Sequence, residues 1–275
     1  MKGEHTIGTL CRTLRVSESG YYQWSRNTPS KRAVENHHLA ERIREAHEHS
    51  RGTYGSVRIA HALGCPGSHN RIARLMRQCG LKGRQRVRYV PRTTQSNHHH
   101  PIAPNLLANH AAPTRANEVW SVDITYIRTG EGWLYLAGVM DMWSRKIIGW
   151  SMQPSLHTSL ALGALRMALQ TRKPASTLLH HSDRGVQYAS REYRNALQTH
   201  RIEASMSRKA NCHDNASMES CWSTLKMELV YRTRFETHAQ ARVAIFDYIE
   251  CFYNRIRLHS SLGYKSPLDF ENSVN

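Results

Sequence analysis

No long hydrophobic run occurs in this 275-residue sequence, and no apolar segment of the signal-peptide type stands at its N-terminus. The longest uninterrupted apolar stretch runs only from Leu134 to Met140, far short of the roughly 20 residues that a membrane-spanning helix needs. Hydrophobic residues still make up 40% of the chain, which is enough for a packed core. The sequence therefore predicts a soluble, cytoplasmic protein.

The cysteines are scattered along the chain, and no Cys-x-x-Cys pair occurs. This pattern predicts reduced thiols in a cytosolic protein rather than a disulfide framework. A zinc site can be drawn from His61, Cys65, His69 and Cys79, but the spacing is unusual for a zinc finger and a Cys-Pro-Gly-Ser turn interrupts it. Reduced thiols are the preferred interpretation. The six cysteines are Cys11, Cys65, Cys79, Cys212, Cys221 and Cys251.

Acidic residues are few: 21 Asp and Glu stand against 38 Lys and Arg, and the formal net charge is +17. The excess is concentrated in residues 1–117, where 19 basic and 6 acidic residues give +13, whereas residues 118–275 have 19 and 15 and a net charge of +4. Such an excess favours a polyphosphate partner, because each neutralised phosphate releases a counterion. An anionic membrane surface is the alternative, but no basic amphipathic helix with a wide apolar face stands out. Residues 1–117 are therefore predicted to be the main DNA-binding part of the chain.

Two stretches of the chain have a less regular pattern than the rest. Residues 1–30 are predicted as a helical segment of helix-turn-helix type, in which Ser17 caps the second helix. Residues 91–117 contain four prolines and are predicted as an interdomain linker. The three histidines of the linker, residues 98–100, are interpreted as a solvated loop rather than a metal site.

A second helix-turn-helix pattern occupies residues 31–90. It consists of a short helix over Ser56–Leu63, a Gly-Cys-Pro-Gly turn, and a basic helix over His69–Cys79 for which Ser68 is the expected cap. This layout places a second helix in the major groove of DNA. A small helical bundle with a solvated basic face is the alternative interpretation. The candidate DNA contacts are Arg71, Arg74, Arg77, Arg84, Arg86 and Arg88.

Strand patterns begin in the remaining part of the chain, residues 118–275. A first strand over Val119–Ile127 and a second over Trp133–Met140 flank a Thr-Gly-Glu-Gly hairpin turn. The order of the later elements, strand, helix, strand, helix, strand and two helices, predicts a mixed α/β sheet rather than a regular βαβ repeat. These later elements are expected at Lys146–Met152, Ser159–Gln170, Thr177–His181, Ser190–His200, Ile202–Met206, Ala216–Leu229 and His238–Tyr253.

Three acidic residues stand out by their surroundings. Asp123 lies in the middle of the first strand among β-branched and aromatic neighbours, where a charge is poorly placed without a partner. Asp183 follows a buried strand, at the carboxyl end where ligands gather in open α/β sheets. Glu219 lies in the first turn of the helix over Ala216–Leu229, and Lys226 lies on the same face two turns further on.

Phosphodiester chemistry explains why such acids would be brought together. A pair of divalent ions activates a nucleophile and stabilises the leaving oxyanion, and magnesium prefers carboxylate ligands. A cation at Lys226 could hold a DNA phosphate beside the ions. Taken singly, each acid has an ordinary explanation: an arginine partner for Asp123, a turn for Asp183 and the helix dipole for Glu219. The rival third ligands are Asp141, Asp214 and Glu228.

Five strings of this sequence, in order, resemble the catalytic core of OrfB-type transposases. They are SVDITYI, GWLYLAGVMDMWSRKIIGWS, HSDRGVQY, NCHDNASMESCWSTLKMELV and YNRIRLHSSLGYKSPLDF. These enzymes form the IS-three family of bacterial insertion sequences and are related to retroviral integrases. The 35 residues between Asp183 and Glu219, and the position of Lys226, match the same family. Several coincident motifs in the right order are far more specific than one.

The resemblance implies an RNase H-like integrase core with a mixed five-stranded sheet, preceded by a small all-α helix-turn-helix region. It implies that Asp123, Asp183 and Glu219 form a DDE triad that holds two magnesium or manganese ions, the aspartates bridging both ions. It also implies metal-dependent nicking at the ends of the insertion sequence, followed by attack of the freed 3′-hydroxyl on another phosphodiester.

The resemblance further implies partners and a location. Double-stranded DNA, as terminal repeats and as target, is the expected partner of a homodimer or higher oligomer in the bacterial cytoplasm, associated with the nucleoid when bound to DNA. A fusion to the product of an upstream reading frame is a further expectation. Two alternatives stay open at this point: an RNase H-like nuclease that cuts without joining, and a non-catalytic DNA-binding regulator.

Overall fold

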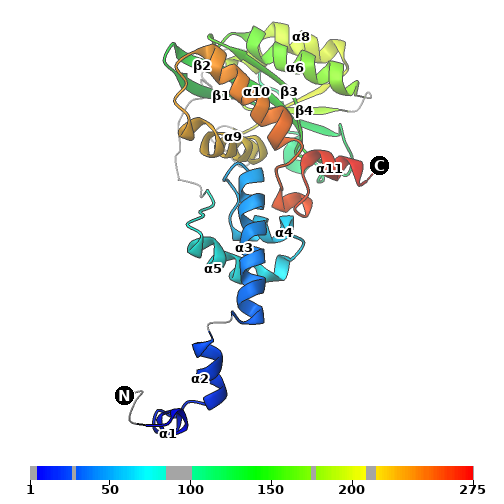
Figure 1. Ribbon diagram of the computed structural model, residues 1–275. Coiled ribbons are helices and arrows are strands. Elements are labelled where there is room, and N and C mark those ends of the chain that lie inside the picture. The colour runs from blue at the N-terminus through cyan, green and yellow to red at the C-terminus, as the bar shows by residue number, and fades with distance from the viewer. Residues whose placement is uncertain (1–4, 27–28, 85–100, 175–177, 209–214, 275) are drawn as a thin grey trace. The chain divides into compact units, whose positions relative to one another are not determined.

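The computed structural model describes residues 5–26, 29–84, 101–174, 178–208 and 215–274. The chain divides into two compact units, Met1–Gly83 and Arg84–Asn275, and each is described by itself (Figure 1). The finer division into four parts, with boundaries at residues 30, 90 and 117, stays a prediction.

The first two helices are α1 (Ile7–Thr13) and α2 (Glu18–Ser25). The hydroxyl oxygen of Thr6, directly before α1, accepts the N–H of Thr9 at 3.3 Å. The hydroxyl oxygen of Ser17, directly before α2, accepts the N–H of Gly20 at 3.1 Å. The predicted cap at Ser17 is therefore confirmed. Of the described residues in the two helices, Cys11 alone is buried, so this pair contributes little apolar packing.

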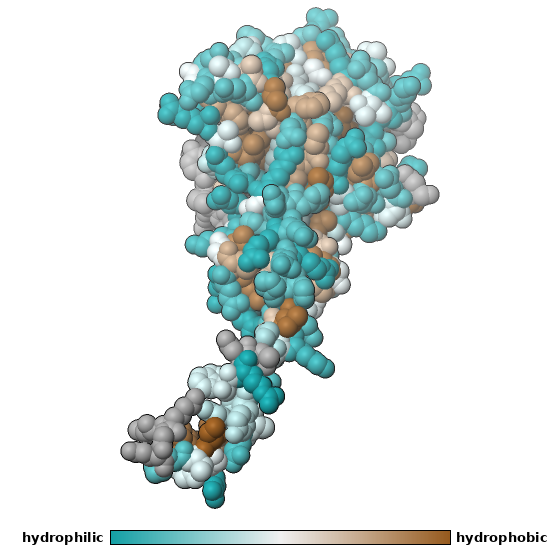
Figure 2. All heavy atoms as spheres, in the orientation of Figure 1, coloured by the Kyte–Doolittle hydropathy of each residue, from teal (hydrophilic) through white to brown (hydrophobic). Residues whose placement is uncertain are grey.

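The helix-turn-helix region consists of four elements. Its core is formed by Ile43, Ile59, Ile72 and Leu75, which are buried at helical spacing on the facing helices. The surface over the long helix is mainly hydrophilic, as expected for a helix with charged outer positions (Figure 2). The elements are α3 (Lys31–His49), α4 (Ser56–Ala62), the 3₁₀ helix η1 (Pro66–Ser68) and α5 (His69–Gln78).

The two ends of α5 differ in how well they follow the sequence pattern. Ser68 makes no side-chain cap, contrary to the prediction, because η1 runs directly into α5 and holds Ser68 at φ −95° and ψ 12° instead of the extended conformation of a capping residue. The other end follows the expected glycine stop. Gly80 adopts φ +70°, and the N–H of Leu81 donates to the carbonyl of Met76 at 2.8 Å.

A mixed five-stranded sheet forms the centre of the second unit, as predicted, in the order β3-β2-β1-β4-β5. The first three strands are antiparallel neighbours, while β4 is parallel to β1 and β5 is parallel to β4. The strands are β1 (Val119–Thr129), β2 (Gly132–Asp141), β3 (Ile147–Gln153), β4 (Leu179–Ser182) and β5 (Glu203–Met206).

One face of the sheet is covered by three helices. Trp120 and Val122 of β1 join the same apolar cluster as Val139 of β2 and the inward side of these helices. Gly149 of β3 allows the close approach, because an added Cβ there would lie 2.3 Å from the carbonyl oxygen of Ala164. The helices are α6 (Thr158–Arg172), α7 (Val186–Ala189) and α8 (Arg191–Thr199).

The opposite face carries Asp123 and is covered by α9 (Ala216–Glu228). Gly138 is the cross-strand partner of Asp123 in β2. An added Cβ at Gly138 would lie 2.6 Å from the ring of Trp222, so the absence of a side chain lets α9 lie close against this face. Trp222 is therefore a packing residue of the core.

The C-terminal segment closes the same unit. The predicted single helix over 238–253 is α10 (His238–Phe246) followed by a π-helix, η5 (Asp247–Tyr253), in which the N–H of Asn254 donates to the carbonyl of Ile249. The prediction was thus right in extent and wrong in type for its second half, in which four residues, Tyr248, Ile249, Phe252 and Tyr253, are buried. Short elements complete the unit: η2 (Leu107–Asn109), η4 (Val230–Arg232), η6 (Ser260–Leu262) and α11 (Pro267–Asn272).

Part of the predicted linker packs on the sheet. The backbone N–H groups of Leu106 and Leu107 donate to the hydroxyl oxygen of Ser205 in β5, at 3.0 and 3.3 Å. Further along, the N–H of Asn117 donates to Asp141 at 2.8 Å. The histidines at 98–100 lie outside the described residues.

Two expectations about class can be compared with the described part of the chain. None of its helices has both the length and the apolar character that crossing a bilayer requires. Its five cysteines are free thiols, and it contains no group of three His, Cys, Asp or Glu side chains arranged to hold a metal. His61, Cys65, His69 and Cys79 thus form no such group in the structure, whereas Cys212 lies outside the described residues.

Candidate active site

The register of the sheet brings Asp123 and Asp183 to corresponding positions. The parallel ladder between β1 and β4 pairs Ser121 with His181 as its last partners. Asp123 and Asp183 each stand two residues beyond that pair, one within the longer strand and one just past the end of β4. Because the pairing of β1 with β4 is parallel and in register, two carboxylates separated by 59 intervening residues lie at the same level on neighbouring strands.

Local hydrogen bonds orient Asp183. One of its carboxylate oxygens accepts the N–H of Gly185 at 2.9 Å, and its carbonyl accepts the Ser182 hydroxyl at 2.9 Å. An added Cβ at Gly185 would lie 2.9 Å from the same carboxylate oxygen, so a side chain there would push it away. The Nε of Arg184 donates to the carbonyl of Ser207 at 2.7 Å, which ties this loop to the residue after β5.

Glu219 lies in the first turn of α9, as predicted, and its side chain is exposed. Two contacts hold this turn. The side chain of Asn215 bonds to β1, and the guanidinium of Arg145 donates to the hydroxyl of Ser217. Lys226 stands two turns along the same helix and is half-buried. The helix thus presents one acid and one base toward the edge that carries the two aspartates.

The charges of these residues act on one another. Burial raises the pKa of Asp123 well above its ordinary value, and the negative charges of Asp183 and Glu219 raise it further. The N–H of Ile124 and the ammonium group of Lys226 oppose that shift. Burial lowers the pKa of Lys226, and Asp123 raises it. The three acids and the lysine therefore share one electrostatic site, although they come from three separate parts of the chain.

The donor set suits a hard divalent cation. Three carboxylates with one nearby ammonium leave an excess of negative charge in a half-buried position, which a bound cation would stabilise. Within the described residues, the acids do not form a ready-made shell of three ligands.

Two of the three rival acids have other partners. Asp141 accepts the N–H groups of Asn117 and Trp143 at 2.8 and 2.9 Å in the turn after β2, and burial raises its pKa. Glu228 accepts two bonds from Arg257, each of 2.8 Å. Both acids are therefore held in structural contacts. Asp214 lies outside the described residues.

Comparison with known proteins agrees with this architecture. Models of the "Integrase core domain" match residues 113–212 and 219–274, and an "HTH-like domain" model matches residues 34–89. The insertion element IS600 uncharacterized 31 kDa protein of Shigella sonnei is 44% identical over 95% of this chain and 97% of its own length. Transposase InsF for insertion sequence IS3A of Escherichia coli is 40% identical over 98% of this chain and 96% of its own length.

The chain belongs to the IS-three family of bacterial transposases. It is a DNA transposase, a polynucleotidyl transferase with an RNase H-like integrase core behind a helix-turn-helix region. Among solved structures, a chain of the simian T-cell lymphotropic virus intasome has a TM-score of 0.48 and 17% identity, over 83% of this chain and 74% of that chain. The assignment rests on the sequence relatives and on the family models.

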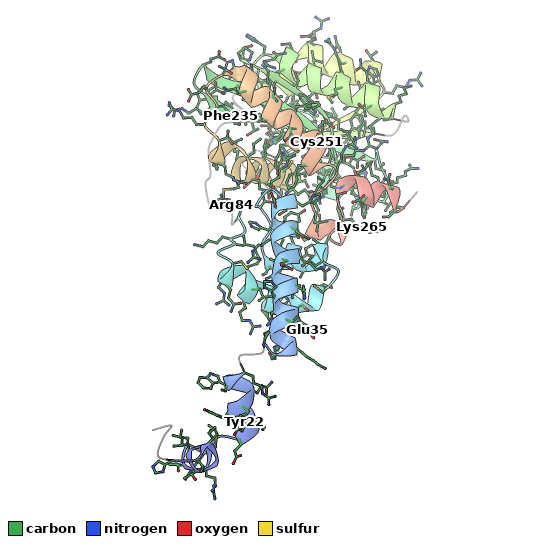
Figure 3. The ribbon with its side chains drawn as sticks, in the orientation of Figure 1. Tyr22, Glu35, Arg84, Phe235, Cys251 and Lys265 are labelled. Atoms are coloured by element: carbon green, nitrogen blue, oxygen red, sulfur yellow. The ribbon has the colours of Figure 1, made fainter. Side chains whose placement is uncertain are left out.

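The predicted DNA contacts of this transposase have different surroundings. Arg71 is half-buried, donates to the side chain of Asn36 at 2.9 Å and lies 3.5 Å from Glu35 of α3, whose position Figure 3 labels. Arg74 and Arg77 are exposed on α5. Arg84, labelled in Figure 3, is also exposed, while Arg86 and Arg88 lie outside the described residues.

Two further side chains lie near the acidic residues of the transposase fold, Asn215, which the sequence does not single out, and Tyr188, which flanks the acids in the sequence. Asn215 is buried directly before α9 and bonds to β1. Tyr188 of α7 is buried, and its pKa is raised well above the ordinary value by burial, by Tyr193 and by the charges of both aspartates. An asparagine four residues before Glu219 is the one signal that could have drawn attention to the first.

Proposed function

We propose that the transposase uses Asp123, Asp183 and Glu219 to hold two divalent ions, magnesium or manganese, at which DNA strands are cut and joined. The observation that carries this proposal is the placement of the acids: the in-register parallel pairing of β1 with β4 puts Asp123 beside Asp183, and the charges of Asp183 and Glu219 both raise the pKa of Asp123. Acids that repel one another in a basic protein are what a site for a divalent cation requires.

In this proposal the three acids and Lys226 have different roles. When bound, the ions polarise the phosphate and lower the pKa of a water or 3′-hydroxyl group. Asp123, Asp183 and Glu219 would hold the ions, and Lys226 would hold a DNA phosphate beside them. In the first step a water oxygen attacks phosphorus and the 3′-oxygen leaves with a proton. In the second step that 3′-hydroxyl attacks a target phosphodiester, one P–O bond replacing another, so no ATP is consumed.

Strand transfer tests the proposal directly. Labelled terminal repeats from the DNA that flanks the reading frame are incubated with the full chain and target DNA, with and without magnesium. Joined molecules that form only with the metal are expected. Cleaved fragments without joined products would instead indicate a nuclease, and metal-independent products would overturn the proposed site.

We also propose that the exposed face of α5 contacts double-stranded DNA through Arg74 and Arg77. Replacing both with Ala is expected to reduce the slope of log affinity against log salt by about two, because each lost phosphate contact removes about one released counterion. The melting temperature should stay unchanged, since both side chains are exposed. DNA binding is measured by fluorescence anisotropy at several salt concentrations.

Arg71→Ala is the matched control for this experiment. Arg71 bonds to Asn36 and pairs with Glu35, so its loss is expected to lower stability by about 1 kcal/mol while changing the salt slope less than the double variant does. A salt slope that stays unchanged in the Arg74 and Arg77 variant would remove this face from the DNA interface.

Lys226 supplies a separate prediction. Lys226→Ala is expected to weaken binding of terminal-repeat DNA and to flatten its salt dependence by about one charge. Arg166→Ala removes an equal charge from the exposed side of α6, on the opposite face of the sheet, and should leave binding unchanged. Equal salt slopes for the two variants would contradict a phosphate contact at Lys226.

Assembly on DNA belongs to the same proposal. Both ends of an insertion sequence and one target must be joined, so we expect at least two copies of the chain in the active complex. A fusion to an upstream reading-frame product stays a prediction of the family resemblance.

A further inference from the structure

Asn215 makes an unusual use of its side chain. It stands directly before α9, a position where Asn commonly caps a helix by accepting a backbone N–H of the first turn. No such bond forms here. Instead, its amide oxygen accepts the hydroxyl of Ser121, and its amide nitrogen donates to the carbonyl of Val122 at 3.2 Å. Asn215 therefore makes two hydrogen bonds to β1 and does not cap α9.

The partners of this amide are the two residues that precede Asp123 in β1. Ser121 is 94 residues away from Asn215 in the sequence, so the contact is purely tertiary. Asn215 is only 6% exposed, and bonds in such surroundings are poorly replaced by water. Both atoms of the amide are used, which fixes its position and its orientation together.

The same helical turn carries Glu219. Glu219 follows Asn215 by four residues, about one turn of helix, and its own side chain is exposed. The position of the Glu219 carboxylate therefore depends on the position of the backbone in the first turn of α9. Met218 and Trp222 pack over Gly138, the cross-strand partner of Asp123, and Arg145 bonds to Ser217. These contacts hold the helix body, while the bonds of Asn215 are the ones that lead directly to the Asp123 strand.

We propose that Asn215 is a positioning residue that sets the distance between Glu219 and Asp123. It touches neither DNA nor metal in this role, and it acts through the backbone of two elements. The inference rests on the proposed function, because the distance matters only if both acids share ions. A magnesium shell tolerates little displacement of its ligands, so freeing the first turn of α9 weakens the site without removing a ligand.

Two variants of the full chain test the role. Asn215→Ala removes both bonds, and Ser121→Ala removes one of them while leaving the Val122 bond in place. Manganese binding is measured by titration calorimetry without DNA, and the magnesium concentration for half-maximal strand transfer is measured separately. We expect Asn215→Ala to raise the manganese dissociation constant and the half-maximal magnesium concentration, each by about ten- to hundredfold, as for other residues that hold metal ligands in place. Ser121→Ala should raise the same two quantities by about fivefold.

The matched control is Asn254→Ala. Asn254 is 3% exposed and bonds through both amide atoms to the backbone of Ile147, at 3.0 and 2.9 Å, in β3 of the same sheet. Its loss should lower the melting temperature as much as the loss of Asn215 does, since both variants break two buried bonds. The metal dependence of the folded Asn254→Ala protein should remain within twofold of the wild type.

The outcomes separate the inference from the proposed function. Suppose that the wild type binds metal and that Ser121→Ala and folded Asn215→Ala bind it with the same affinity. This result overturns the positioning role alone. Equal losses in Asn215→Ala and Asn254→Ala also overturn it, because both would then reflect stability. A wild-type chain that binds no manganese overturns the proposed site and this inference with it. Should Asn215→Ala fail to fold, the Ser121→Ala titration decides.

Discussion

Asp183→Asn is expected to abolish strand cleavage and strand transfer, with a loss of about 10³-fold or more. Losing a metal ligand removes several kcal/mol of transition-state stabilisation, and each 1.4 kcal/mol is about tenfold in rate. The asparagine oxygen can still accept the N–H of Gly185, so the loop should keep its conformation. Removing one of the mutually repelling charges should leave the melting temperature unchanged or slightly raised.

The experiment compares cleavage of labelled ends, DNA affinity and melting temperature for wild type and variant. DNA affinity should be retained, which distinguishes a lost reaction from lost binding. Glu192→Gln removes a charge of the same sign from the exposed first turn of α8 and should keep full activity. If Asp183→Asn retains more than about a tenth of wild-type cleavage, a loss that a single hydrogen bond would explain, Asp183 is not a metal ligand.

The second large effect concerns stability. Glu228 and Arg257 form a buried pair with two bonds of 2.8 Å, and the hydroxyl of Tyr248 donates to the same carboxylate at 2.7 Å. Burial opposes the charge on Arg257, but its bonds to Glu228 outweigh that effect and raise its pKa. Arg257→Ala leaves Glu228 charged and buried without its main partner, which costs about 3–5 kcal/mol.

For a unit of this size, the predicted loss corresponds to a fall in melting temperature on the order of 10 °C, measured by calorimetry or circular dichroism. Arg255→Ala is the control. Its side chain is exposed and donates to the carbonyl of Glu250, so its removal should change the melting temperature by about 1 °C or less. A similar stability for both variants would mean that the ion pair is not what joins α9 to the C-terminal segment.

The buried position of Arg257 shows that charge alone does not assign a basic residue to DNA binding. Sequence alone allows Arg257 to contact DNA or to pack, and the fold uses it to bind Glu228 inside the unit. The same distinction applies at Arg71, which is half-buried against α3 and differs in this from the exposed Arg74. A basic residue is thus assigned to DNA only after its partners within the chain are known.

Patterns over a few neighbouring residues are sufficient to predict much of this fold. Alternation of apolar and polar residues marks β1, a continuous apolar run marks β2, and the hairpin turn between them is visible in the glycines. The first-turn position of Glu219, the cap at Ser17 and the stop at Gly80 are equally local. The order of strands and helices, with the family resemblance, leads to the five-stranded integrase core.

Contacts between distant residues decide the rest. The bonds of Asn215 to β1, the pair of Glu228 with Arg257 and the switch to a π-helix after Phe246 join or depend on segments that are separated in the sequence. No short-range pattern encodes them, because each arises only when the elements pack and leave a buried polar group that needs a partner. Local propensity thus chooses the elements and places the acids on them, while tertiary packing alone sets how far apart the acids lie.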